Sequence, residues 1–151
     1  MSNIRQITEV GDPILRQTAM EVKRFDESLA KLLDDMKATL AELKGVGLAA
    51  PQVGVSKRLF IVDVGEGVIE FINPVINKTK GKEIDSEACF SIPGRQGLVE
   101  RAKEVKVTAQ DRDGKEFTIK AKDLFARAIQ HELDHLNGRL YIDIMTEEEI
   151  I

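Results

Sequence analysis

The sequence predicts an α+β fold in which antiparallel β-sheets pack around a helix close to the C-terminus. Three observations support this prediction. Two segments show apolar residues at helical spacing, four segments rich in β-branched residues lie between them, and short turn signals separate these four segments. Strands joined by short turns are expected to form antiparallel hairpins.

The first helix is expected from Asp26 to Lys44. Asp26 can cap its start and Gly45 can end it. The chain before the helix, from Ile4 to Phe25, carries a Gly-Asp-Pro turn signal and is expected to form an arm that lies across the domain. The apolar residues that recur at spacings of three and four in the helix are Leu29, Leu32, Leu33, Met36, Leu40 and Leu43.

The strands are expected in the middle of the chain, where Gly-Glu-Gly, Asn-Pro and Asp-Arg-Asp-Gly punctuate the β-branched runs. Lys106 alternates with Val105 and Val107, so that strand should have one buried face and one solvated face. Asp113-Gly114 supplies a tight turn. The expected strands are Arg58 to Val64, Val68 to Ile76, Glu100 to Ala109 and Glu116 to Ala121.

A second helix is expected from Asp123 to Asn137, with Gly138 placed to end it. The chain shows no repeats, linkers or low-complexity stretches, so one domain that spans residues 1–151 is expected. The apolar residues of this helix are Leu124, Ala128, Leu133 and Leu136.

Composition argues against several classes of protein. The content of 42% hydrophobic and 32% charged residues is ordinary for a soluble folded chain. A net charge of -4 argues against direct binding of nucleic acid. No apolar run approaches the roughly 20 residues that cross a bilayer, and the N-terminus lacks the apolar region of a signal peptide, so no membrane partner is expected.

The single cysteine, Cys89, cannot form a disulfide within the chain and therefore fits a reducing compartment, so we expect a cytoplasmic protein. We also expect a monomer.

The second helix carries the run His131-Glu132-Leu133-Asp134-His135. Two imidazoles four residues apart lie about 40° apart around a helix and one turn along it, so both can bind one metal ion. Glu132 lies about 100° round from His131, where its carboxylate can reach a metal-bound water as a general base. A surface helix with two solvated histidines is the alternative. The metal is favoured because the only two histidines of the chain both fall in this motif.

A catalytic site of this kind needs a third protein ligand and one open position for water. Tyr141 stands where the extended metallopeptidase pattern has a third histidine, so the endopeptidase interpretation fails there. Asp143 and the glutamates of the tail are alternative ligands. Cys89 is the strongest candidate, because a thiolate binds borderline-soft divalent ions and this unpaired cysteine needs an explanation. The ion would lower the pKa of its water towards about 7.

Two further segments carry candidate hydrogen-bond donors. Residues 45–54 are rich in Gly and Ala, and Gln52 is their only long polar side chain; it can donate to an oxygen near the metal or be a simple turn amide. Residues 87–94 present Cys89 on an extended stretch, so the N–H of Phe90 would lie beside the metal. Glu87 is either a buried partner for a basic group such as Arg101 or a surface acid.

The three segments together resemble the peptide deformylase family in their residues, their order and their separation. They are Gly45-Val46-Gly47-Leu48-Ala49-Ala50-Pro51-Gln52, Glu87-Ala88-Cys89-Phe90-Ser91 and His131-Glu132-Leu133-Asp134-His135. The resemblance covers most of the chain, from about Ile7 to Asp143. It implies that the metal ligands are Cys89, His131 and His135, that Glu132 is the general acid and base, and that the donors to the formyl oxygen are Gln52 and the Phe90 N–H.

The resemblance also implies the reaction, which is hydrolysis of the N-formyl group at the start of an N-formylmethionyl nascent peptide, close to the ribosome. It implies one divalent ion, usually Fe²⁺, for which Zn²⁺, Ni²⁺ or Co²⁺ can substitute. The alternatives are a metallopeptidase or amide hydrolase with another substrate and a non-catalytic domain stabilised by a metal. For Leu124 and Ala128, core packing is an equal alternative to a substrate contact. The residues implied to contact substrate are Val46, Gly47, Ala88, Leu124, Arg127 and Ala128.

Three features depart from the family pattern, which usually has Gly before the cysteine and Leu after it. This chain has Ala88 and Phe90, although Phe90 still supplies its backbone N–H. Ala88 would be strained by about 1 kcal/mol or more at positive φ, whereas in extended backbone it only adds a methyl group to the substrate groove. Many bacterial members also continue into a long C-terminal helix; here the acidic residues Glu147 to Glu149 are expected to fray.

Overall fold

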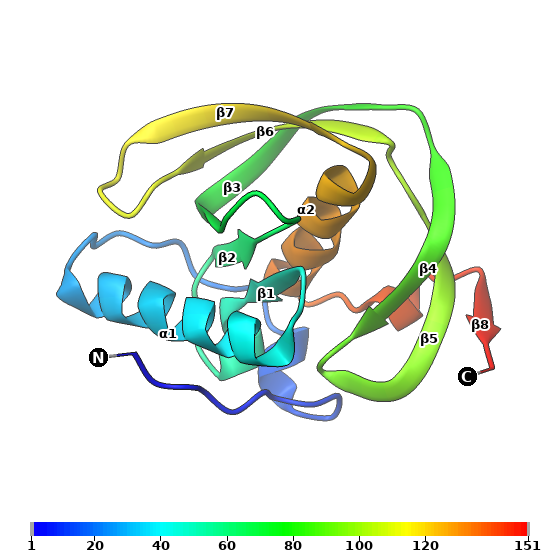
Figure 1. Ribbon diagram of the computed structural model, residues 1–151, viewed down its shortest axis with the longest axis horizontal. Helices are drawn as coiled ribbons and strands as arrows, with labels where there is room; N and C mark the ends of the chain where they lie inside the picture. Colours follow the sequence, from blue (N-terminus) through cyan, green and yellow to red (C-terminus); the bar gives the residue numbers. More distant parts are fainter. Residues whose placement is uncertain (1, 151) are drawn as a thin grey trace.

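The computed structural model describes residues 2–150 as two antiparallel sheets with two α-helices, which confirms the predicted fold class (Figure 1). Neither α-helix in this range is long and apolar enough to cross a membrane. The helices are α1 (Glu27–Leu43) and α2 (Asp123–Leu136), and the strands are β1 (Gly47–Ala49), β2 (Leu59–Val62), β3 (Ile69–Lys80), β4 (Glu83–Cys89), β5 (Ile92–Arg101), β6 (Glu104–Gln110), β7 (Glu116–Lys122) and β8 (Glu147–Glu149).

The large sheet has the strand order β1-β2-β3-β6-β7, and each neighbouring pair is antiparallel. The Asn-Pro pair lies inside β3 and marks an irregularity in its pairing with β6, between Ile72 and Val75. Asn73 has a φ of 52°, which asparagine tolerates better than most residues. Its side chain accepts from the Val22 N–H and donates to the Val22 carbonyl, both at 2.9 Å. The bulge thus ties the N-terminal arm to the sheet.

The predicted alternation in β6 is confirmed, because Val105 and Val107 are buried and Lys106 is exposed. The expected strand from Glu100 to Ala109 is wrong as one element. It covers the end of β5 and all of β6 except its last residue, and these two strands belong to different sheets. Local β-branched content does not reveal this break, because the position of the break depends on which sheet each half of the segment joins.

The small sheet has the order β4-β5-β8 and was largely missed from the sequence. Its outer strand corrects the expectation that the acidic tail frays, since β8 pairs with β5 over Gln96 to Leu98. The carboxylate of Glu148 accepts two hydrogen bonds from Arg95, at 2.7 and 3.1 Å. An unpaired strand edge and a nearby guanidinium together order a segment that its own composition would leave disordered.

Helix α1 begins as predicted, because the Asp26 side chain accepts a hydrogen bond from the Leu29 N–H at 3.0 Å. Its end differs by one residue. Lys44, with a φ of 55°, takes the left-handed capping conformation that was expected of Gly45. The apolar face of α1 packs with residues of β1 and β2 in one cluster.

Helix α2 lies between the large and the small sheet (Figure 1). Its apolar side packs with the large sheet around Phe60 and Phe71, whose rings stack at 5.0 Å. Its C-terminal end is held by Arg58, which donates to the Leu136 carbonyl at 2.9 Å and to Asn137 at 3.0 Å. On its other side Arg127 of α2 donates to Glu87 of β4 and to the Val99 carbonyl of β5, so residues of both sheets meet along this helix.

The N-terminal arm crosses the domain as expected. The Thr8 N–H donates to the Gln52 carbonyl at 2.8 Å, and the Val10 N–H donates to the Ser91 carbonyl at 2.7 Å. Further along, the Ala19 N–H donates to the Leu136 carbonyl at 2.8 Å. The arm thus touches the glycine-rich segment, the cysteine segment and the end of α2, three pieces that are distant in sequence.

Candidate active site

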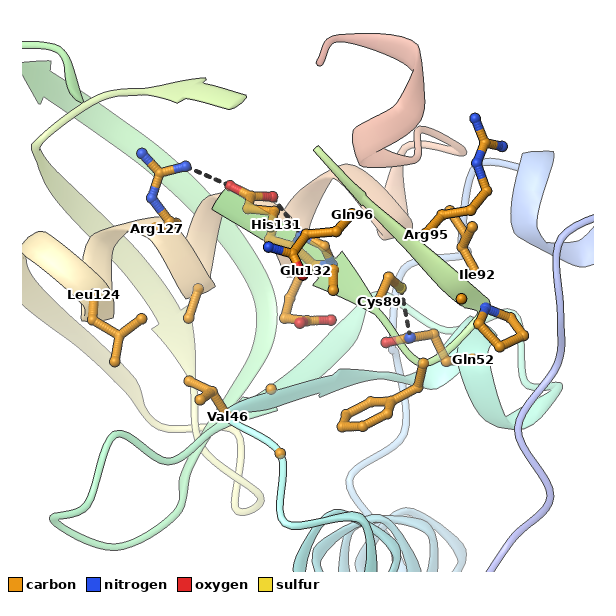
Figure 2. A pocket seen from close by; sticks show the side chains of 18 residues that line it. Val46, Gln52, Cys89, Ile92, Arg95, Gln96, Leu124, Arg127, His131 and Glu132 are labelled. Atoms are coloured by element: carbon orange, nitrogen blue, oxygen red, sulfur yellow. Dashed lines mark hydrogen bonds and ion pairs between the residues drawn. The ribbon is translucent and has the colours of Figure 1, made fainter. Parts of the chain in front are cut away.

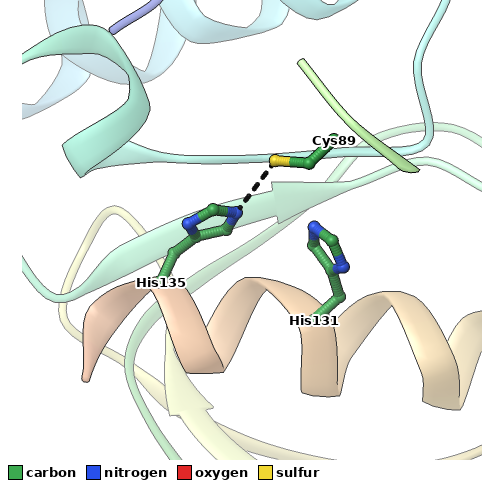
Figure 3. A group of neighbouring side chains, drawn as sticks. All are labelled: Cys89, His131 and His135. Carbon is green, nitrogen blue, oxygen red and sulfur yellow. Dashed lines mark hydrogen bonds between the residues drawn. The ribbon is translucent and has the colours of Figure 1, made fainter. Parts of the chain in front are cut away.

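The predicted ligand residues Cys89, His131 and His135 lie together (Figure 3), and their ligand atoms are all within 4.8 Å of one another. Helix α2 presents the two imidazoles from adjacent turns, with ring centroids 5.1 Å apart. Strand β4 ends at Cys89, whose Sγ is 3.4 Å from Nε2 of His135. One thiolate and two imidazoles are a set that suits Zn²⁺, Fe²⁺ and similar ions.

The two imidazoles differ in their electrostatic surroundings. Burial lowers the pKa of His135 well below its ordinary value, so the ring is neutral. Burial also disfavours the charged form of His131, but hydrogen bonds to Cys89 and Glu87 outweigh it and raise the pKa of His131 to about 10. A metal ion at this cluster would have to displace that proton.

Glu87 orients His131, because its Oε1 lies 2.7 Å from Nδ1 of that ring. A carboxylate on one ring nitrogen leaves the other nitrogen to face an ion. Burial raises the pKa of Glu87, but hydrogen bonds with His131 and Arg101 outweigh burial and hold the pKa well below its ordinary value. The sequence left Glu87 open between a buried partner of Arg101 and a surface acid. The buried partner is correct.

Two arginines complete this buried network. Arg101 donates two hydrogen bonds of 2.9 Å to Glu87 and also pairs with Asp134 on α2. Arg127 donates to Glu87 at 2.7 Å and to the carbonyls of Val99 and Glu83 at 2.9 and 2.8 Å. Arg127 was expected among the residues that line the substrate pocket, and it does line the cavity. Its guanidinium ties α2 to β4 and β5.

Glu132 is buried next to this cluster, and its Oε1 has no hydrogen-bond partner among the described residues. Burial raises the pKa of its carboxyl to about 7. A carboxyl with such a pKa can both take and return a proton near neutral pH. An unsatisfied buried oxygen also indicates that a polar group completes the site when it works.

Gln52 is buried in the short 3-10 helix Ala50–Val53 that follows β1, and it is held in one orientation. Its Oε1 accepts from the Ala49 N–H at 2.9 Å. Its Nε2 therefore points towards Cys89 and Ser91, at 3.4 and 3.2 Å from their side-chain atoms. A fixed amide donor at the edge of a candidate metal site can bind an oxygen of a ligand or substrate.

A cavity of about 440 Å³ opens in front of these groups (Figure 2). Each predicted site residue except His135 lines it. Leu124 is 54% exposed and Ala128 only 7%, so core packing does not account for Leu124. The sequence missed one wall, which follows Cys89 in β5, because nothing in those residues signals a site apart from their nearness to the cysteine. The residues of that wall are Ile92, Pro93, Gly94, Arg95 and Gln96.

The two departures beside Cys89 are both accommodated. Ala88 lies in β4 and does not have a positive φ, so it is unstrained and adds a methyl group to the cavity wall. The ring of Phe90 packs directly against Gly45, so closely that a Cβ on residue 45 would lie 2.4 Å from the ring. Phe90 therefore joins the cysteine segment to the glycine-rich segment.

The donor set and the free carboxylate oxygen fit a divalent metal ion. A three-ligand site next to a buried proton-transfer group, open to a cavity, is the arrangement of metal-dependent hydrolases. Comparison with known proteins defines the family within this class.

Residues 4–150 match the family model described as polypeptide deformylase. Peptide deformylase 1 of Clostridium acetobutylicum is 53% identical over 146 residues, which cover 97% of each chain. Among solved structures, peptide deformylase from Thermotoga maritima has a TM-score of 0.94 with 42% identity and covers 95% of this chain and 99% of that one. The peptide deformylase from Synechococcus elongatus in complex with actinonin has a TM-score of 0.92 with 41% identity, and the match covers 95% of this chain and 79% of that one. The chain belongs to the polypeptide deformylase family.

Proposed function

We propose that this chain removes the N-formyl group from the N-terminal formylmethionine of nascent polypeptides and releases formate. The observation that carries the proposal is the buried Glu132 carboxylate, with one free oxygen, beside Cys89, His131 and His135 in a member of the deformylase family. The substrate class follows from the family.

Cys89, His131 and His135 would hold one divalent ion, which we propose to be Fe²⁺, with Zn²⁺, Ni²⁺ or Co²⁺ as substitutes. The ion would supply Lewis-acid chemistry and lower the pKa of a water to about 7. Glu87 supports this site by orienting the His131 ring through its 2.7 Å contact.

Glu132 is proposed to take a proton from the attacking water and to deliver it to the amine that leaves. Its burial and its raised pKa suit both steps. Gln52 Nε2 and the Phe90 N–H are proposed to donate to the formyl oxygen as negative charge develops there. Because the Gln52 amide is already fixed by Ala49, little reorganisation is needed at the moment of reaction.

The substrate is proposed to lie in the cavity between two backbone segments. Val46 and Gly47 line one side and Ala88 the other, while Leu124, Ala128 and the Arg127 stem form the wall on α2. Residues 1–151 would act as one catalytic domain, because both sheets and α2 contribute to this cavity. We further propose a monomer in the cytoplasm that works close to the ribosome.

The test is formate release from a formyl-Met peptide by protein prepared without oxygen, with metal analysis on the same sample. Glu132→Gln should keep the metal and lose about 10²–10⁴-fold in turnover. A variant as active as the wild type would refute the role of Glu132. Cleavage of internal peptide bonds without formate release would instead favour a metallopeptidase, and bound metal without any hydrolysis would favour a non-catalytic domain.

A further inference from the structure

Five exposed lysines gather at one end of the large sheet, where β3 and β7 end and β6 begins. We call this surface the lysine face. It surrounds a hollow of about 340 Å³ that lies apart from the candidate active site. Its residues are Lys78, Lys80, Lys106, Lys120 and Lys122.

The strand register places these lysines side by side. Lys106 is directly opposite Lys78 on β3 and Lys120 on β7, which makes a row of three like charges across three strands. In the next row Glu104 stands between Lys80 and Lys122. Like charges directly opposite each other destabilise a sheet.

The row of three lysines is not neutralised by any carboxylate of the described residues. No carboxylate forms an ion pair with any lysine of the lysine face in residues 2–150, and one glutamate stands among five lysines. Adjacent strands are about 4.8 Å apart, so the charges form a closely spaced array. The whole chain carries a net charge of -4, so the positive charge of the lysine face is opposite in sign to the net charge of the protein. Such an array is complementary to a partner with regularly repeated negative charges.

The lysine face points away from the candidate active site. Val105 and Ala121, which alternate with the lysines along β6 and β7, are buried in the cluster that includes α2. The lysines are therefore on the opposite surface of the sheet from α2, and Figure 1 shows this end of the sheet next to the start of that helix. A partner bound there would leave the cavity in front of Glu132 open.

The neighbouring part of the same surface carries hydroxyl and amide groups. Asn77 donates to Thr108 at 2.6 Å, and the hydroxyls of Thr108 and Thr118 lie 2.9 Å apart. Side chains of these types, with lysine, make the contacts to phosphate oxygens in nucleic-acid complexes. A membrane-surface site would instead need several large apolar side chains next to the lysines. Among the residues of β3, β6 and β7, Val75, opposite Thr108, is the one large apolar side chain that is exposed.

We infer that the lysine face docks on the phosphate backbone of RNA. This inference rests on the proposed function, because a nascent polypeptide emerges from a particle rich in RNA. Docking through this face would hold the enzyme near its substrate while the active site stays accessible. The net charge of the chain argued against nucleic acid, but it averages over a surface that the fold makes strongly uneven.

The test measures binding of the metal-loaded protein to a fluorescent RNA hairpin over a range of salt concentrations. The variant Lys106→Gln/Lys120→Gln removes the centre of the lysine face. Each lost phosphate contact should reduce the magnitude of the slope of log K against log salt by about 0.7–0.9. The variant loses two contacts, so its slope should be smaller in magnitude by about 1.4–1.8. Its melting temperature should be equal to or higher than that of the wild type, because like-charge repulsion is relieved.

The control is Lys23→Gln/Lys115→Gln, which changes the net charge equally. Lys115 follows the turn at the other end of the β6–β7 hairpin, and both control lysines are exposed. This variant should keep the wild-type slope. Equal slopes for the wild type and both variants would overturn the inference, and so would binding to phosphatidylserine vesicles in place of RNA. Both variants should hydrolyse a free formyl-Met peptide at the wild-type rate. If the wild-type protein does not hydrolyse this peptide, that result counts against the proposed function, whereas the salt slopes alone decide the inference about RNA.

Discussion

Gly47 shows how a single missing side chain shapes the site. A Cβ at this position would lie 2.6 Å from Oε2 of Glu132, closer than real Cβ contacts allow. Its φ is not positive, so backbone conformation does not require glycine here. The glycine instead leaves space for the Glu132 carboxylate beside the ligand cluster.

We predict that Gly47→Ala lowers kcat about 10-fold or more while metal content stays unchanged, because the added methyl group displaces the Glu132 carboxylate. Steady-state kinetics with formyl-Met peptide and metal analysis provide the measurement. The double variant with Glu132→Gln should be no slower than Glu132→Gln alone. Additive losses would show that Gly47 acts independently of Glu132.

Glu87 is the residue on which the buried ionic network depends. We predict that Glu87→Gln destabilises the protein by about 3 kcal/mol, because two buried guanidinium groups lose their carboxylate. Metal affinity should also fall about 10–100-fold, because the His131 ring loses its orienting partner. Urea unfolding and metal titration measure the two effects. The surface variant Glu100→Gln, on β5, serves as the control and should change neither.

At the scale of elements, strand β8 is the clearest case of structure imposed from outside the segment. We predict that a chain ending after Thr146 unfolds with a free energy lower by about 1 kcal/mol, because β5 loses three paired residues. Glu148→Gln alone should have a smaller effect, since the Arg95–Glu148 pair is well exposed. Thermal unfolding of both variants provides the measurement. Equal stability of the shortened chain and the wild type would mean that β8 contributes nothing.

At the scale of the whole molecule, the N-terminal arm is anchored to α1 through the Asp35 carboxylate and the Thr39 hydroxyl, which accepts from the Arg5 N–H at 2.9 Å. Asp35 accepts from the Asn3 N–H at 2.9 Å, from Arg5 Nε at 3.0 Å and from Lys31 at 2.8 Å. The hydrogen bond from Asn3, followed by that from Lys31, lowers the pKa of Asp35 far below its ordinary value of 3.8. The anchor therefore depends on the charged form of this residue.

A carboxyl with a depressed pKa contributes stability that is complete above the pKa of the unfolded chain and is lost as the pH falls towards the folded value. We predict that Asp35→Asn lowers the melting temperature at pH 7, and that the difference from the wild type shrinks below about pH 4. Melting curves between pH 7 and pH 3 test this. A difference that stays constant over this range would assign the effect to packing instead of charge.

The sequence by itself determined the features that depend on local spacing or on inventory. The helical period places His131 and His135 on one face with Glu132 beside them, and Asp26 caps α1 through its own side chain. The single cysteine was predicted as the third ligand because the chain offers few alternatives. The two helical inferences hold because they involve residues within one helix or at its first turn, whereas the approach of Cys89 to the histidines depends on how β4 packs against α2.

Only the tertiary structure decided which distant segments meet. From the sequence Glu87 could be a surface acid, but in the structure β4 places it beside Arg101 and Arg127. From the sequence the acidic tail was expected to fray, but in the structure it pairs with the edge of β5. The lysine face likewise exists only because the β3–β6–β7 register places separate lysines in one row. Burial, ion pairing and surface charge depend on packing between elements, and no local period in the sequence encodes that packing.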